Sequence, residues 1–204
     1  CSSDQPAESP PAAETGAQPE NTTLPSLGMA PDFELTNQDG VRIALSGLRG
    51  SVVLMNFIYT SCPDVCQLQN LDLKRVRSLL DETSRSELTL VSVTFDPEFD
   101  TPPVLKNYSR GLGGEIPEWY FLTGSLEEIA RVTEDYGVYY ALVPEETRTH
   151  DDGTAETHAR GFNHMNQAYL IDRQGMVRRQ YIGMQAGGQV FPIDGMVADI
   201  SALP

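Results

Sequence analysis

Two cysteines separated by three residues are the most chemically suggestive feature of this chain. Cys62 and Cys66 lie in the segment TSCPDVC, residues 60–66. On a helix this spacing places two side chains on one face, one turn apart. A thiolate is both a nucleophile and a soft-metal ligand, and the positive end of a helix dipole stabilises it. The pair therefore indicates dithiol redox chemistry or soft-metal binding. A purely stabilising disulfide is disfavoured, because closing so short a loop gains little.

The sequence around this pair predicts a strand that leads into a helix. Residues 52–59 read VVLMNFIY, a run with the length and the β-branched and aromatic content of a buried strand. Pro63 suits the first turn of a helix, and Ser61 is a candidate cap before it. Apolar residues then recur at roughly helical spacing: Leu68, Leu71, Val76, Leu79 and Leu80. Both thiols are thus expected where a core strand meets a helix N-terminus.

The rest of the chain alternates strand-like and helix-like segments. Ser125 and Glu128 form a capping-box pattern at the start of one helix, and Thr101 with Pro102 begins another. Residues 144–163 are polar and predict a long exposed loop. We expect further strands near residues 41–45, 88–95, 119–122, 139–143, 166–171 and 176–182, and a last helix after Pro192. This order predicts an α/β fold with a mixed central sheet flanked by helices.

Composition and charge exclude several classes of protein. The chain has 204 residues and is 40% hydrophobic, which allows one domain with a sizeable core. Its formal net charge of −15 argues against a nucleic-acid partner, because phosphate binding needs a cationic surface. No apolar run approaches the roughly 18 residues that a membrane-spanning helix requires.

The beginning of the chain differs from the rest. It is rich in Ser, Pro, Ala, Glu, Gln and Thr, so we expect a disordered tether over residues 1–28 and a folded domain over residues 29–204. A chain that starts with Cys1 and continues into such a tether resembles a mature bacterial lipoprotein, whose first cysteine carries lipid. That resemblance implies a membrane-anchored domain facing the periplasm or the cell exterior, where cysteines can be oxidised.

Three motifs occur in one order along the folded part. They are FIYTSCPDVC at residues 57–66, FDPEFDTP at residues 95–102, and His164 five residues before YLID at residues 169–172. Together, from about residue 29 to the C-terminus, they resemble the Sco/SenC family of thioredoxin-like copper proteins. Family members often have proline after the second cysteine, and this chain has Gln67 there.

The resemblance implies a thioredoxin-like fold in which Cys62, Cys66 and His164 are the copper ligands and Asp96 lies near the metal. It also implies two activities. The first is delivery of copper to the dinuclear copper centre of cytochrome c oxidase. The second is thiol–disulfide reduction that prepares the cysteines of that centre.

The donor set agrees with copper. Thiolates are soft and select Cu(I), whereas imidazole suits Cu(I), Cu(II) or zinc. A structural zinc site needs four protein ligands, so zinc would have to recruit His150, His158 or a carboxylate. Those two histidines lie in the polar segment 144–163 and are expected to be solvated side chains. Met165, a soft donor, directly follows His164.

Two classes of function therefore share the same residues. One is a copper metallochaperone that passes its metal to the copper-bearing subunit of cytochrome c oxidase by ligand exchange. The other is an extracytoplasmic thiol–disulfide oxidoreductase in which Cys62 and Cys66 cycle between dithiol and disulfide. A pure reductase has no need of His164 as a ligand, which favours copper. Nothing but the expected fold suggests a third class, peroxiredoxin-like hydroperoxide reduction.

Overall fold

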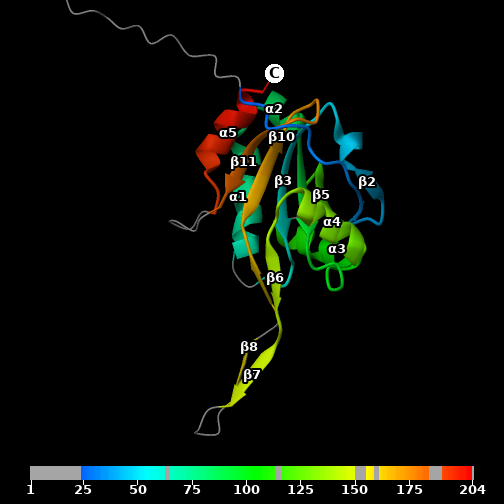
Figure 1. Cartoon of the computed structure of the whole chain (residues 1–204). Coiled ribbons are helices and arrows are strands. Elements are labelled where there is room, and N and C mark those ends of the chain that lie inside the picture. Colours follow the sequence, from blue (N-terminus) through cyan, green and yellow to red (C-terminus); the bar gives the residue numbers. More distant parts are fainter. Residues whose placement is uncertain are drawn as a thin grey trace, which may run out of the picture.

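The structure, a computed structural model, describes residues 24–62, 65–113, 116–149, 155–158, 161–183 and 190–203. Within these ranges the central element is a seven-stranded mixed sheet of order β11-β10-β3-β4-β5-β1-β2 (Figure 1). β3, β4 and β5 run parallel to one another, and the other neighbouring pairs are antiparallel. The strands are β1 Glu34–Asn37, β2 Arg42–Ala44, β3 Val52–Ile58, β4 Leu88–Thr94, β5 Trp119–Thr123, β10 Gln167–Ile171 and β11 Val177–Ile182. The predicted mixed sheet is confirmed.

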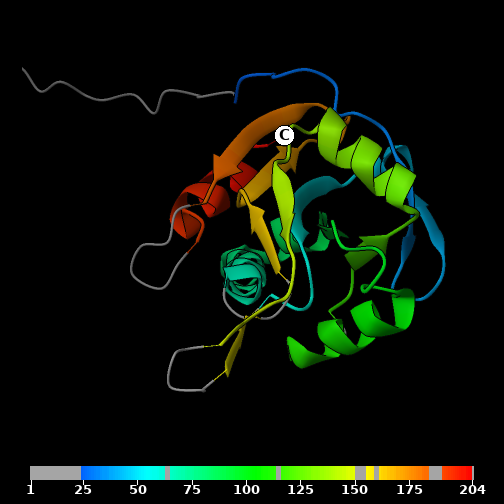
Figure 2. The same cartoon turned by 60° about the horizontal axis from the view of Figure 1, so that its bottom comes forward.

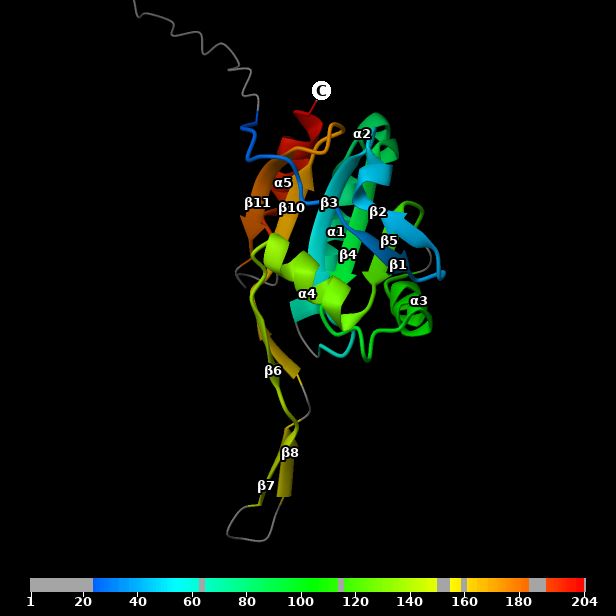
Figure 3. The same cartoon turned by 45° about the vertical axis from the view of Figure 1, so that its right-hand side comes forward.

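Helices cover both faces of this sheet. α1, α3 and α5 lie on one face and α4 lies on the other (Figures 2 and 3). The capping box predicted at the start of α4 is present, with the Ser125 and Glu128 side chains each bonded to the other residue's main-chain N–H. Thr101 is the N-cap residue of α3, although its side chain makes no capping bond. The helices are η1 Leu45–Leu48, α1 Val65–Leu79, α2 Glu82–Ser86, α3 Pro102–Gly111, α4 Leu126–Asp135 and α5 Ile193–Ser201.

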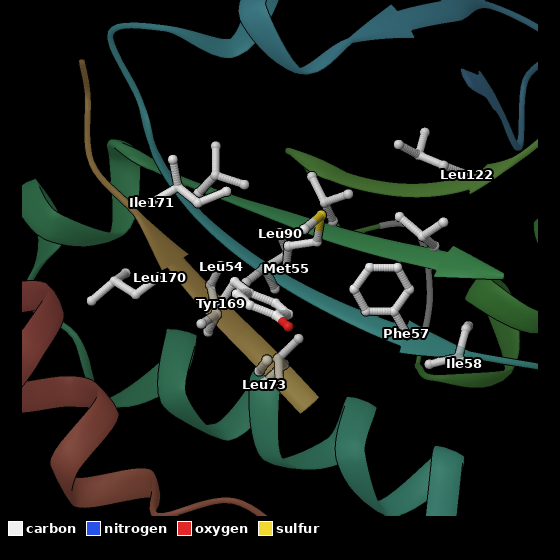
Figure 4. Packing of buried hydrophobic residues seen from close by; sticks show 14 of the residues in the cluster. Leu54, Met55, Phe57, Ile58, Leu73, Leu90, Leu122, Tyr169, Leu170 and Ile171 are labelled. Atoms are coloured by element: carbon white, nitrogen blue, oxygen red, sulfur yellow. The ribbon is translucent and has the colours of Figure 1, made fainter. Parts of the chain in front are cut away.

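The core is built around β3. Every residue of β3 and β4 is buried, because helices cover both faces of this parallel pair. Phe57 of β3 packs against Tyr169 of β10 and against Tyr136 at the end of α4, with ring centroids 6.3 and 6.0 Å apart. On the other face, Leu73 of α1 approaches the sheet (Figure 4). This rigid centre supports the chain segment that carries Cys62.

The predicted helix α1 is present, but its buried face does not follow the apolar residues alone. Leu71 and Leu79 are exposed, whereas Gln69, Asn70 and Asp72 are buried. Buried polar side chains need partners inside the protein. Asn70 finds them in Asn56 of β3 and Tyr108 of α3, and Asp72 accepts hydrogen bonds from the N–H groups of residues 190 and 191. Hydrophobicity alone could not identify this inner face.

The polar segment 144–163 is the largest correction to the sequence analysis. Instead of a loop, β6 Tyr140–Val143 pairs with β9 Gly161–His164, and β7 Glu146–Thr149 pairs with β8 Ala155–His158. This ribbon projects away from the sheet (Figures 1 and 3). A ribbon outside the core does not need alternating apolar side chains, so the period-two signal of a strand is missing from its sequence.

The packed chain begins before Met29, where the sequence analysis placed the start of the domain. Leu24 is buried, and Leu27 and Gly28 exchange main-chain hydrogen bonds with Val177 of β11. Residues 1–23, including Cys1, lie outside the described residues. Among the helices of the described chain, none has the length and apolar character needed to cross a membrane.

Candidate metal centre

Cys62 lies in the segment that follows β3. The strand ends at Ile58, and the next residue, Tyr59, is buried. The main-chain N–H of Cys62 donates to the carbonyl oxygen of Tyr59 at 3.4 Å, and the Cys62 side chain is 4% exposed. Cys66 belongs to the first turn of α1, as predicted, but its side chain and residues 63–64 lie outside the description.

Asp100 holds this segment in place. Its carboxylate accepts hydrogen bonds from the main-chain N–H of Thr60 at 3.0 Å, from the Thr60 hydroxyl and from the Thr94 hydroxyl. Burial raises the pKa of the Asp100 carboxyl, while the bonds from Thr60 and Thr94 act in the opposite direction. Asp100 was not among the residues predicted for the site. Its signal in the sequence is a second aspartate, after Asp96, inside the segment 95–102.

His164 reaches the same end of the sheet from the ribbon. Its ring lies edge-on to the ring of Tyr59, with centroids 5.7 Å apart and an interplanar angle of 87°. It also contacts the ring of Phe95, which follows β4, at 5.1 Å. Tyr140 and Phe162 complete this aromatic cluster, defined here as Tyr59, Phe95, Tyr140, Phe162 and His164. The cluster joins the ribbon to the ends of β3 and β4.

The imidazole of His164 is suited to bind a metal. Nδ1 lies 3.3 Å from the main-chain carbonyl oxygen of Met165. With the proton on Nδ1, the ring donates to that carbonyl and Nε2 carries the lone pair that a metal requires. Metal-bound histidines commonly use their second nitrogen in this way, which fixes the tautomer and the ring orientation.

Asp96 lies at the end of β4, close to this cluster in the chain. It is 2% exposed, and its main-chain N–H donates to the Thr94 hydroxyl at 3.0 Å. The neighbouring Phe95 N–H donates to the carbonyl oxygen of Ile58, which ties the ends of β3 and β4 together. Asp96 therefore lies at the corner where β4 leads into the following loop, and its expected place near the metal stays a prediction.

The structure brings Cys62 and His164 to a shared neighbour, Tyr59. Among the side chains that are described, no three His, Cys, Asp or Glu residues converge as a metal site. Because the Cys66 side chain is outside that description, the ligand set of Cys62, Cys66 and His164 stays a prediction. His158 belongs to β8, and His150 lies outside the described residues.

Comparisons with known proteins agree with this arrangement. The family model SCO1/SenC matches residues 22–191. The SCO2-like protein of Rickettsia prowazekii is 31% identical over 151 residues, which cover 73% of this chain and 67% of that protein.

Two solved structures share the fold. One is Bradyrhizobium japonicum ScoI with copper bound, with a TM-score of 0.64, 27% identity and coverage of 86% of this chain and 99% of that chain. The other is BsSco, a member of the Sco family of cytochrome c oxidase assembly proteins in which a disulfide switch was identified. Its TM-score is 0.64 and its identity is 26%, and the alignment covers 88% of this chain and 96% of that chain. The expected thioredoxin-like architecture is confirmed. Because the family match spans most of its length, the chain belongs to the SCO1/SenC family.

Proposed function

We propose that this protein is a copper metallochaperone. It holds copper as cargo through Cys62, Cys66 and His164 and passes the metal to the copper-bearing subunit of cytochrome c oxidase, for its dinuclear copper centre. The observation that most supports this proposal is the contact of His164 with Tyr59, whose carbonyl oxygen accepts the N–H of Cys62. That contact explains why a histidine far along the chain is held beside the cysteine segment.

The chemistry of the three side chains suits transfer rather than permanent storage. Two thiolates and one imidazole are soft or borderline donors, which select Cu(I) over hard cations. Cys66 lies in the first turn of α1, and a helix N-terminus favours the thiolate form of a cysteine. Three ligands leave Cu(I) open to an incoming thiolate or imidazole of the recipient, and exchange then proceeds one ligand at a time.

The solved relatives support both halves of the proposal. Bradyrhizobium ScoI has copper bound, and BsSco is described as a member of a family of cytochrome c oxidase assembly proteins. The structural alignment with each of them covers more than four-fifths of this chain. We extend their copper binding and assembly role to this protein as part of the proposal.

A Cu(I) competition titration against a chromophoric chelator tests the proposal on the fully reduced protein. We expect one tightly bound copper per chain. We expect Cys62→Ala, Cys66→Ala and His164→Ala each to weaken binding by more than about 100-fold, because even a residue that only supports a ligand typically contributes 10–100-fold. His158→Ala is the matched control, since this second histidine belongs to the same ribbon, and its affinity should equal that of the wild type. Equal affinity of His164→Ala and the wild type would refute the ligand set.

A second candidate function, thiol–disulfide exchange, is favoured by the disulfide switch described for BsSco. One thiolate of the pair would attack a partner disulfide and form a mixed disulfide. The second would then displace the partner as a thiol, leaving a Cys62–Cys66 disulfide and transferring two electrons and two protons to the partner. With a cysteine removed, exchange stops at the mixed disulfide. Mass spectrometry of Cys62→Ala and Cys66→Ala, each mixed with a disulfide peptide, should therefore trap the adduct in one variant; no adduct in either variant argues against this activity.

A further inference from the structure

We propose that Gln69 and Asn166 form a link that positions His164 relative to the helix carrying Cys66, so that Gln69 is a positioning residue of the copper site. This inference rests on the proposed function. Gln69 Nε2 donates a hydrogen bond to Asn166 Oδ1 at 2.9 Å. Gln69 is three positions after Cys66 in α1, and Asn166 is two positions after His164. One hydrogen bond thereby connects the two segments that supply the expected ligands.

An apolar residue would be expected at position 69, because the residues that follow it at helical spacing along the buried face of α1 are apolar. Gln69, Leu73, Val76 and Leu80 follow one another at helical spacing, and each is at most 2% exposed. A leucine at position 69 would continue this apolar stripe. A buried amide loses its hydrogen bonds to water, and the loss is offset only where protein partners replace them.

The replacement is incomplete at Gln69. Its Oε1 atom is buried and has no hydrogen-bond partner among the described atoms. Stability alone therefore does not account for an amide here, because an apolar side chain would avoid the cost of an unpaired oxygen. Buried polar pairs of this kind can instead define one geometry between two elements, and here the elements are the cysteine helix and the histidine segment.

The link between Gln69 and Asn166 acts together with the ring contacts that His164 makes in the aromatic cluster. The aromatic cluster ties the ribbon to the ends of β3 and β4, which fixes His164 relative to the sheet. Asn166 is held by a main-chain bond from Gly183 N–H at 2.7 Å, and a Cβ atom at Gly183 would lie 3.0 Å from Asn166 Cβ. Asn166 is thus tightly packed and can transmit the position of α1 to His164.

The test is a double-mutant cycle between Gln69 and His164, read out by the same Cu(I) titration. Gln69→Leu fills similar space without the amide, and we expect about tenfold weaker binding than wild type, in the range for residues that support a ligand. In the His164→Ala background Gln69→Leu should have no further effect, because Gln69 acts through His164. Gln67→Leu is the matched control, since Gln67 is exposed on the same helix, and it should bind copper as the wild type does.

Asn166 provides an independent check in case Gln69→Leu folds poorly. Asn166→Asp keeps an oxygen that accepts from Gln69 Nε2 and should retain wild-type affinity, whereas Asn166→Leu should lose about as much as Gln69→Leu. Equal losses from Gln69→Leu in both backgrounds would overturn the inference, because they would indicate a general effect on folding. Wild-type copper affinity in both Gln69→Leu and Asn166→Leu would also overturn the inference.

A copper-free measurement separates this inference from the proposed function. The NMR signals of the His164 imidazole in the metal-free protein should shift in Gln69→Leu and not in Gln67→Leu. If those signals shift while His164→Ala binds copper like the wild type, the link stands and the proposed function fails. If His164→Ala weakens binding while Gln69→Leu changes neither the signals nor the affinity, the link is overturned and the proposed function stands.

Discussion

Asp100 accepts hydrogen bonds from both the main-chain N–H and the hydroxyl group of Thr60, a residue forty positions earlier in the chain. Thr60 is two residues before Cys62, so this carboxylate ties the acidic segment after β4 to the cysteine segment after β3. The Thr94 hydroxyl is the third donor, and Asp100 itself is fully buried. The FDPEFDTP motif therefore holds the cysteine segment through direct hydrogen bonds to Asp100, one of its two buried acidic residues.

Replacing Asp100 by alanine should destabilise the protein. Asp100→Ala removes the acceptor of three donors in a buried place, and the free energy of unfolding should fall by about 3 kcal/mol, since a buried donor left without its acceptor costs roughly 1–3 kcal/mol. Urea unfolding measures the change. Glu98→Ala, which removes an exposed acid from the same segment, should stay within about 0.5 kcal/mol of the wild type. An Asp100→Ala protein as stable as the control would mean that the carboxylate does not support Thr60.

The raised pKa of Asp100 predicts a pH dependence of stability with a definite sign. Because the folded-state pKa lies above its ordinary value of 3.8, protonation favours the folded state. This contribution is complete below the ordinary value and is lost as the pH rises through the folded-state pKa. Asp100→Asn cannot titrate at this position, so the stability of the wild type relative to Asp100→Asn should increase as the pH falls from about 7 to about 4.5. Urea unfolding of both proteins at the two pH values gives the difference, in which the other carboxyl groups largely cancel. A difference that is constant or moves the opposite way contradicts the assignment.

The aromatic cluster should control the mobility of His164. Phe162→Ala removes ring contacts to Tyr59 and Phe95 at 5.1 and 5.2 Å, and aromatic pairs contribute about 0.5–1.5 kcal/mol each beyond their buried area. We expect faster hydrogen exchange of the β9 amides and weaker Cu(I) binding, with the sheet core still protected. Leu142 is the direct cross-strand neighbour of Phe162 and is 52% exposed, so Leu142→Ala is the matched control. If the two variants exchange at the same rate, the rings do not hold the ribbon.

Copper should stabilise the folded protein through linkage. A ligand that binds only the folded state adds about 2.7 kcal/mol when its free concentration is 100 times the dissociation constant. Thermal unfolding of the reduced protein, with Cu(I) buffered by a chelator, should therefore shift to higher temperature in the wild type and in His158→Ala. Cys62→Ala and His164→Ala should show little shift under the same buffered Cu(I). An equal shift in all four proteins would place the copper at another site.

Much of the architecture could be predicted from local patterns. β3 and β4 read as mostly apolar runs rich in β-branched residues because both their faces are covered, and the capping box at Ser125 marks the start of α4. The ribbon could not be predicted in this way. Its outer strands, β7 and β8, project away from the sheet and consist mainly of polar residues, so the apolar periodicity that predicts a strand is absent there (Figure 1).

The cysteine pair and its location between a core strand and a helix follow from short-range patterns, namely the apolar run before Cys62 and the helical spacing after Cys66. The surroundings of His164 and the roles of Asp100 and Gln69 do not. Each depends on a contact between segments far apart in the chain, Tyr59 with His164, Thr60 with Asp100 and Gln69 with Asn166. Such contacts arise only when β3, β4, α1 and the ribbon pack together, because the cost of burying a polar or aromatic group depends on the partners that the fold supplies.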